Sequence, residues 1–316
     1  MSGILVAQED IMAHSNFSPI EKRIKQLHNK SNFSTTVLFP GIELSFIHLE
    51  TDKIDFHHDA LDHMLEINYC HSGRIGWQLT NGNFVYLGPG DYALHTMKTC
   101  AESVMTLPNG DYDGLTICID LDKLSKNPPE LLADTNINGT FLYDKFCKNE
   151  MFSSFSGNSE TENIFRNFYG KQKQLQHSYY QIKTLELLLY LCELDFSGKN
   201  QLSEYQSEQI ELIRTIHEQL ISNLDKRFTI EALSKQYLIN TTTLKTMFKA
   251  VYGTSIASHV KAHRMEKAAG LLRNTQESIA DIAIQVGYDS QSKFSASFRE
   301  QYHMLPSEYR KTSLTE

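Results

Sequence analysis

Residues 229–253 read TIEALSKQYLINTTTLKTMFKAVYG, and residues 278–303 read SIADIAIQVGYDSQSKFSASFREQYH. The two stretches share their pattern of apolar residues, and Phe248 of the first aligns with Phe298 of the second. An offset of about 50 residues is in the range in which internal repeats mark a reused structural unit. The chain is therefore predicted to contain two copies of one helical unit.

Each copy carries signals for two helices joined by a short turn. Thr229 and Ser278 precede apolar residues at helical spacing, so each hydroxyl is predicted to cap a first helix. Asn240 and Ser290 are the predicted caps of the second helix in each copy. About three residues separate the two helices, as a helix–turn–helix requires. Two ordinary helical hairpins are the alternative, and the repeated spacing of caps and apolar residues argues against them.

The composition describes a globular chain. Its 316 residues predict two domains by the usual size of a domain. The 5 cysteines include no C-x-x-C pair, which favours a reducing cytosol over a disulfide scaffold or a zinc site. The N-terminus lacks a basic segment followed by an apolar one, and no run of about 18 apolar residues occurs. We therefore expect a soluble cytoplasmic protein without membrane association.

The formal net charge of −8 is unevenly distributed along the chain. Residues 205–316 hold 14 Lys and Arg against 12 Asp and Glu, so their net charge is +2. The remainder holds 16 of the 30 basic and 26 of the 38 acidic residues, a net charge of −10. Because +2 is weakly basic, any affinity for nucleic acid depends on where the Lys and Arg side chains lie.

Residues 37–200 are predicted to form the first domain, preceded by a polar arm over residues 1–36. As far as residue 120, short runs of β-branched and aromatic residues alternate with Gly, Pro and Asn turn signals. This spacing predicts a small antiparallel barrel or sandwich. The Asn81-Gly82 dipeptide suits a type I′ turn and predicts a hairpin over residues 75–87.

The same region carries polar and aromatic residues that suit the binding of a small organic effector. The candidates are His57, Glu66, Tyr69, Trp77 and His95. The histidines and Glu66 resemble the metal site of cupins, in which imidazoles and a carboxylate from neighbouring strands hold the metal. The His-x-His pair of such a site is absent, because His57 and His58 are adjacent and point to opposite faces of a strand. We therefore predict no metal and no cofactor, and core packing explains Trp77 about as well as ligand stacking.

Helices are predicted to follow the strands. The clearest is Tyr179–Phe196, which carries an apolar stripe. The stripe consists of Ile182, Leu185, Leu188, Leu189 and Cys192. Such a stripe packs against its own domain or forms the seam of a homodimer. Ser197-Gly198-Lys199-Asn200 ends the helix and marks the domain boundary, after which residues 205–316 form the second domain.

If the second helix of each repeat enters a major groove, its polar face contacts DNA. In the first repeat this face consists of Thr242, Lys245, Thr246 and Lys249. In the second repeat the matching face consists of Ser292, Ser295, Ala296 and Arg299, and Gln291 and Lys293 flank it. A Lys side chain can donate to guanine, and a Thr side chain can contact a base edge. Serine side chains are short and reach few groups on the bases. The first repeat is therefore predicted to carry sequence specificity, and Lys293 and Arg299 to contact phosphates. A solvated face without a partner is the alternative.

Residues 208–310 resemble the DNA-binding domain of AraC/XylS-type transcriptional regulators. The second repeat carries the motif of that family at Ala283, Gly287-Tyr288, Phe294, Phe298-Arg299, Pro306 and Tyr309-Arg310. The family's base-reading positions fall on Thr242, Lys245 and Thr246. Leu65–Cys70, Gly73 and Leu87–Asp91 are similar to the sensor domain of a subgroup that includes siderophore-responsive regulators. The resemblance implies double-stranded DNA as a partner and an organic effector.

Two positions depart from the family pattern. His303 stands where most members have Gly to end the last recognition helix, and such an end often needs a positive φ. Leu238 stands in the first turn, where a small residue is common.

The sequence thus predicts an α+β protein with a cupin-like antiparallel β-barrel and a C-terminal domain of two helix–turn–helix units joined by a linker helix. We expect a transcriptional activator, not an enzyme, that binds DNA, an effector and RNA polymerase and forms a homodimer. One alternative is a cupin-type metalloenzyme fused to a DNA-binding domain. Another is a regulator that a protein partner controls.

Overall fold

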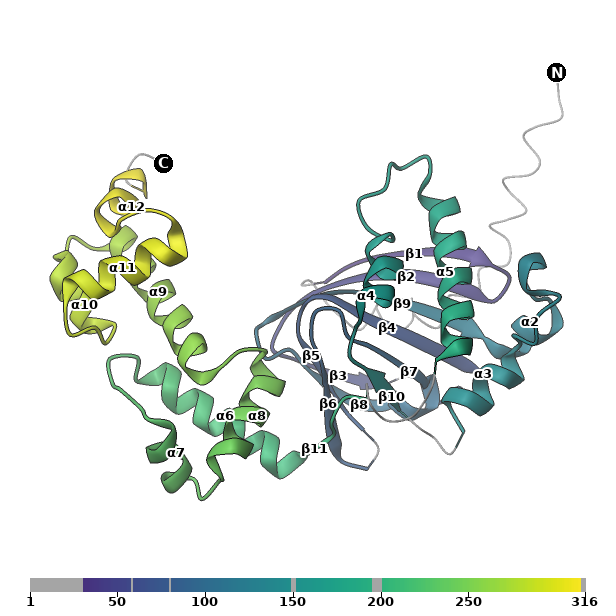
Figure 1. Cartoon of the computed structure of the whole chain (residues 1–316), viewed down its shortest axis with the longest axis horizontal. Helices are drawn as coiled ribbons and strands as arrows, with labels where there is room; N and C mark the ends of the chain where they lie inside the picture. The colour runs from purple at the N-terminus through teal and green to yellow at the C-terminus, as the bar shows by residue number, and fades with distance from the viewer. Residues whose placement is uncertain (1–30, 58, 80, 149–151, 195–200, 314–316) are drawn as a thin grey trace. The chain divides into compact units, whose positions relative to one another are not determined.

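The computed structural model describes residues 31–57, 59–79, 81–148, 152–194 and 201–313 (Figure 1). The chain divides into two compact units, the first ending at Glu204 and the second beginning at Tyr205. The first unit contains antiparallel sheets with helices, and the second consists almost entirely of helices. The predicted α+β class is therefore confirmed. Among the described residues, no helix is both long and apolar enough to cross a membrane.

The strands of the first unit form two sheets. In order across it, the first sheet contains β1 (Ser31–Phe39), β2 (Ile42–Glu50), β9 (Asp111–Asp120), β4 (Met64–Gly73), β7 (Tyr92–Thr96) and β10 (Ser153–Phe155). Within the first unit, the strands of the second sheet are, in order, β6 (Asn83–Leu87), β5 (Ile75–Gln78), β8 (Glu102–Thr106) and β3 (Lys53–His57). Strands β5 and β6 form the predicted hairpin, but its turn is not the predicted type I′. Gly82 has a φ of +82°, whereas Asn81 lacks the positive φ that a type I′ turn also needs.

The prediction of a closed cupin-like barrel is wrong for the described strands. No strand pairing joins the first sheet to the second, and β1 and β10 are the edges of the first sheet. The two sheets instead enclose a shared apolar layer that includes Leu49, Cys70 and Trp77. Side-chain packing, not a continuous ladder of backbone hydrogen bonds, therefore holds the sheets together.

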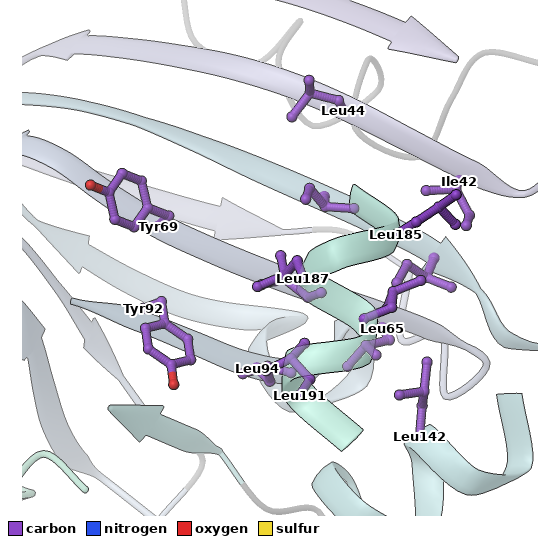
Figure 2. Packing of buried hydrophobic residues seen from close by; sticks show 14 of the residues in the cluster. Ile42, Leu44, Leu65, Tyr69, Tyr92, Leu94, Leu142, Leu185, Leu187 and Leu191 are labelled. Carbon is purple, nitrogen blue, oxygen red and sulfur yellow. The ribbon is translucent and has the colours of Figure 1, made fainter. Parts of the chain in front are cut away.

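Helices cover the other face of the first sheet. They are α4 (Ser159–Arg166) and α5 (Gln176–Glu193), and shorter helices lie at its end: η1 (Met97–Cys100), α2 (Leu121–Lys126), η2 (Glu130–Leu132) and α3 (Gly139–Phe146). Figure 2 shows Leu187 and Leu191 of α5 packed toward Leu65 and Leu94 of the sheet. Burying these side chains stabilises the fold by about 1.5–3 kcal/mol each.

The predicted stripe on α5 is partly wrong. Leu185 and Leu188 are buried, but Ile182 is 58% exposed and Leu189 is 47% exposed. Leu187 and Leu191, outside the predicted stripe, are fully buried. Several apolar residues follow one another here, so helical spacing does not identify the buried face, and the position of the sheet selects it.

The second unit begins with β11 (Tyr205–Gln206) and continues with α6 (Ser207–Ser222), α7 (Ile230–Gln236), α8 (Thr241–Tyr252), α9 (Ile256–Asn274), α10 (Ile279–Gln285), α11 (Gln291–Tyr302) and α12 (Pro306–Ser313). All four predicted helix caps are confirmed. Thr229 accepts from the backbone N–H of Ala232, and Ser278 accepts from that of Asp281. Asn240 and Ser290 cap α8 and α11 in the same way.

Arg264 of α9 connects the two helix pairs of this unit. Its guanidinium donates to the backbone oxygen of Lys226 at 2.9 Å and to that of Gly287 at 3.1 Å. Gly287 has a φ of +78°, and a Cβ there would lie 2.5 Å from the backbone oxygen of Leu224. The turn of the second pair therefore packs against the chain that enters the first, and this approach requires glycine.

Candidate functional site

Helix α8 presents two chemically different faces. Leu244, Met247 and Phe248 are buried in the core of the unit. The four residues predicted to contact DNA, Thr242, Lys245, Thr246 and Lys249, are all exposed on the other side. Among the described residues, neither lysine forms a hydrogen bond or ion pair with another side chain. The helix contains no acidic residue, so its surface has a net positive charge.

Helix α11 repeats this division with a less polar surface. Phe294 and Phe298 are buried. Of the residues predicted to contact DNA, Gln291, Ser292, Lys293 and Arg299 are exposed, whereas Ser295 is half-buried. Glu300, the acidic residue of this helix, accepts from Lys261 of α9 at 2.7 Å. Lys293 and Arg299 therefore remain as the charged groups that are directed to solvent.

Two capped helix pairs with basic exposed faces define the class of a helix–turn–helix DNA-binding protein. Residues 233–312 match the family described as Helix-turn-helix domain. The chain is 32% identical over 100 residues to the regulatory protein SoxS of Salmonella typhimurium. The aligned segment covers 32% of this chain and 94% of SoxS. The chain therefore belongs to the AraC family of transcriptional regulators.

Other relatives match over part of their length. The HTH-type transcriptional activator RhaR of Mannheimia succiniciproducens is 28% identical over 126 residues, or 40% of this chain and 44% of RhaR. The crystal structure of fatty-acid-bound ToxT from Vibrio cholerae covers 89% of this chain and 95% of its own, at 14% identity and a TM-score of 0.36. SoxS and RhaR are regulators, not enzymes.

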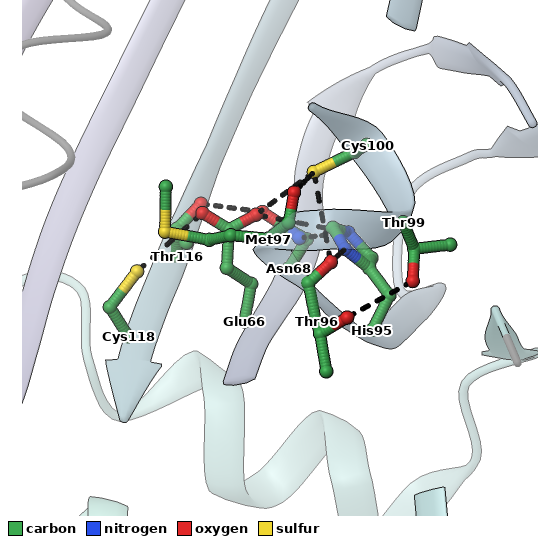
Figure 3. Close-up of polar contacts among 9 residues, drawn as sticks. All are labelled: Glu66, Asn68, His95, Thr96, Met97, Thr99, Cys100, Thr116 and Cys118. Carbon is green, nitrogen blue, oxygen red and sulfur yellow. Dashed lines mark hydrogen bonds and ion pairs between the residues drawn. The ribbon is translucent and has the colours of Figure 1, made fainter. Parts of the chain in front are cut away.

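In the first unit, a buried polar cluster lies between the sheets (Figure 3). Asn68 donates to Nε2 of His95 at 3.0 Å, and Nδ1 of His95 faces the backbone oxygen of Thr96 at 3.1 Å. Thr116 donates to the Asn68 oxygen at 2.6 Å. These contacts fit a His95 tautomer in which Nδ1 donates to the Thr96 oxygen and Nε2 accepts from Asn68.

Glu66 lies within the same cluster. The thiols of Cys100 and Cys118 are 3.7 Å and 3.6 Å from its carboxyl oxygens, and Nε2 of His95 is 3.9 Å from it. The ligand atoms of Glu66, His95 and Cys100 lie within 4.8 Å of one another. Binding of a metal there would displace Asn68 from Nε2 of His95 and the two thiols from Glu66.

The five candidate effector residues do not form one site. Glu66 and His95 meet in the buried cluster, and Phe152 lies between His95 and Trp77, with ring centroids 4.7 Å and 6.2 Å from theirs. Tyr69 packs on the opposite face of the first sheet and stacks on Phe165 at 4.1 Å. The side chain of His57 lies outside the described residues.

Tyr69 borders an open cleft of about 720 Å³ beside α4. Its polar lining includes His71, Asp91, Glu162 and Arg166. The carboxylate of Asp91 accepts from the backbone N–H groups of Gly88 at 2.8 Å and Gly157 at 3.4 Å. Burial raises the pKa of Tyr69 to about 12, so its hydroxyl is a neutral hydrogen-bonding group at neutral pH.

Sequence reasoning missed the charged residues of this cleft. Arg166 and Asp91 are far apart in the sequence, and the packing of α4 on β4 brings them together. It also missed a group of three histidines in the second unit, His217, His259 and His263. Here a signal was available, because His259 and His263 are four residues apart and lie on one face of a helix.

Proposed function

We propose that the chain is a sequence-specific regulator in which both helix pairs are helix–turn–helix units. Helix α8 reads base edges through Thr242, Lys245 and Thr246. Helix α11 positions the protein through phosphate contacts of Lys293 and Arg299. The observation that carries this assignment is the exposed polar face of α8, whose lysines have no partner among the described side chains and are free to bind DNA.

The linker supports binding of both units to one side of the duplex. Helix α9 has 19 residues, which correspond to about 28 Å at 1.5 Å per residue. Recognition helices in successive major grooves lie about 34 Å apart. The distance between the two recognition helices is the length of this spacer plus about half the width of a helix at each of its ends. That sum is compatible with the groove separation.

Selection of DNA from a random library by the full chain tests the proposal. The wild-type chain should enrich one motif, and Lys245→Ala should lose preference at one or two base pairs of it, by about 1–3 kcal/mol of discrimination. Lys267→Ala, which removes an exposed lysine from α9, is the matched control and should keep the motif. An unchanged motif for Lys245→Ala would show that α8 does not read bases in this register.

Arg299→Ala tests the role of α11 in the same assay. Because a phosphate contact carries no sequence information, affinity should fall alike for the selected motif and for scrambled DNA. The slope of log affinity against log salt concentration should decrease by about 1. A loss confined to the selected motif would instead assign base contacts to Arg299.

For the first unit we propose binding of a small organic effector in the cleft beside α4. A volume of about 720 Å³ is in the range of small-molecule sites. Tyr69 supplies an aromatic edge and a hydroxyl, and Arg166 supplies a fixed positive charge that suits a carboxylate or another anionic group. The resemblance to a subgroup that includes siderophore-responsive regulators, and the buried residues Glu66 and His95 as an effector site, remain predictions from the sequence.

We also propose that the chain forms a homodimer through α5. The exposed face of α5 carries Tyr179, Ile182 and Leu189, and Leu175 directly precedes the helix. These exposed apolar residues support a homodimer seam opposite the packed face. We further propose that effector binding shifts the chain toward an arrangement that activates transcription with RNA polymerase. A regulator controlled by a protein partner is the alternative, and it predicts no response to any small molecule.

A further inference from the structure

Three histidines of the second unit converge on one point. His217 comes from α6, and His259 and His263 come from successive turns of α9. One nitrogen from each ring lies within 4.8 Å of the corresponding atoms of the other two. The Nε2 atoms of His259 and His263 are 3.2 Å apart. Three imidazole nitrogens from two packed helices thus lie close together.

The surrounding core holds these rings in place. His217 stacks on Tyr252, the last residue of α8, with ring centroids 4.3 Å apart. His259 is only 8% exposed and meets the edge of Phe248 at 5.4 Å. His263 is half-buried and opens the group to solvent on one side. A ligand can therefore enter beside His263 while the other two rings stay in place.

The spacing of the rings suits metal ligation. At a metal–nitrogen distance of about 2.0–2.1 Å, tetrahedral ligands lie about 3.3 Å apart. The 3.2 Å between His259 and His263 already matches this separation.

A carboxylate also orients one of the rings. Glu266, three residues after His263, places an oxygen 3.3 Å from Nδ1 of His263. A proton on Nδ1 is then directed to the carboxylate, and a metal would take the Nε2 lone pair of His263 in place of its 3.2 Å contact with Nε2 of His259. Such outer carboxylate contacts are the usual companions of metal-binding histidines.

We propose that His217, His259 and His263 bind one divalent transition-metal ion, of which Zn²⁺ is the best match. Three imidazoles leave one coordination position for water or an external group on the open side. The ion connects α6 to α9 beneath the C-terminal end of α8. Metal binding therefore holds the base-reading helix against its linker and strengthens DNA binding by the full chain.

Zinc titration of the full chain, purified without a polyhistidine tag and stripped with a chelator, tests the proposal. Competition with a chromogenic chelator should give one zinc ion per wild-type chain. Co²⁺ in place of zinc should give the visible absorption of a four-coordinate site. His263→Gln should weaken binding by more than about 100-fold, and Glu266→Gln by about 10-fold through the outer contact.

Three controls make the result specific. His263 is half-buried, so His263→Gln should keep the far-ultraviolet circular dichroism of the wild type even if a change at buried His259 does not. His177→Gln, an exposed histidine of α5, should bind zinc like the wild type. Cys100→Ser removes the competing group of Glu66, His95 and Cys100 in the first unit and should also retain zinc.

The outcomes separate the proposal from its competitors. Loss of zinc in His263→Gln, with retention in His177→Gln and Cys100→Ser, supports the site. A wild-type chain that takes up no zinc at micromolar concentration overturns it. So does equal binding by His263→Gln, or loss confined to Cys100→Ser. Zinc should also raise the DNA affinity of the wild type and leave that of His263→Gln unchanged.

Discussion

At the scale of single residues, two side chains adopt backbone angles that favour glycine. His303 ends α11 with a φ of +59°, and Leu238 in the turn between α7 and α8 has a φ of +53°. Leu238 is 92% exposed, so no burial of its side chain offsets the cost. A left-handed conformation costs a residue with a Cβ about 1–2 kcal/mol. The departures from the family pattern therefore carry real strain.

His303→Gly is predicted to stabilise the chain. Relief of the left-handed strain should exceed the entropy that glycine adds to the unfolded chain, about 0.4–1 kcal/mol, and leave a net gain of about 0.5–1 kcal/mol. Urea denaturation followed by circular dichroism measures it. Ala296→Gly, at an exposed position inside α11, should instead cost about 1 kcal/mol. If His303→Gly destabilises the chain, the histidine side chain makes a contact that outweighs the strain.

At the scale of elements, α5 has one face in the core and one apolar face toward solvent. Ile182→Asp places a charge on the exposed face without touching the buried leucines, so it should convert a homodimer to a monomer. Sedimentation equilibrium of the full chain measures the change, with His177→Asp on the same helix as the control. A wild-type chain that is monomeric at tens of micromolar, or a dimer that survives Ile182→Asp, would contradict the proposed seam.

At the scale of the whole molecule, effector binding in the first unit is expected to change the DNA affinity of the second. Effector candidates that carry an anionic group should change the DNA affinity of the full chain, and Arg166→Ala should abolish the response while leaving DNA binding without effector unchanged. Fluorescence anisotropy with the selected motif measures both quantities. Glu66→Gln is the comparison, because it changes the buried cluster and not the cleft. Loss of the response only in Glu66→Gln would place the effector between the sheets.

The sequence by itself determined the helix pairs, their four caps and the two faces of α8. These features depend on interactions within about one or two helical turns, which residue type and spacing encode directly. The hairpin over residues 75–87 belongs to the same class, although its turn is not the type I′ that Asn81-Gly82 predicted. Strands β3 and β8 lack such local signals. Lys53–His57 mixes charged and apolar residues, and pairing defines both strands, since β3 pairs with β8 and β8 also pairs with β5.

Only the tertiary structure decided which side chains meet. Tyr69 and Glu66 are three residues apart on β4, yet the alternation of a strand sends them to opposite faces, so one borders the cleft and the other joins His95. Arg166 reaches that cleft because α4 packs on the sheet, and His217 reaches His259 because α6 packs on α9. Such meetings depend on contacts between distant segments, which local periodicity does not encode. The fold therefore defines the cleft and the three-histidine site, whereas the sequence defines the surface offered to DNA.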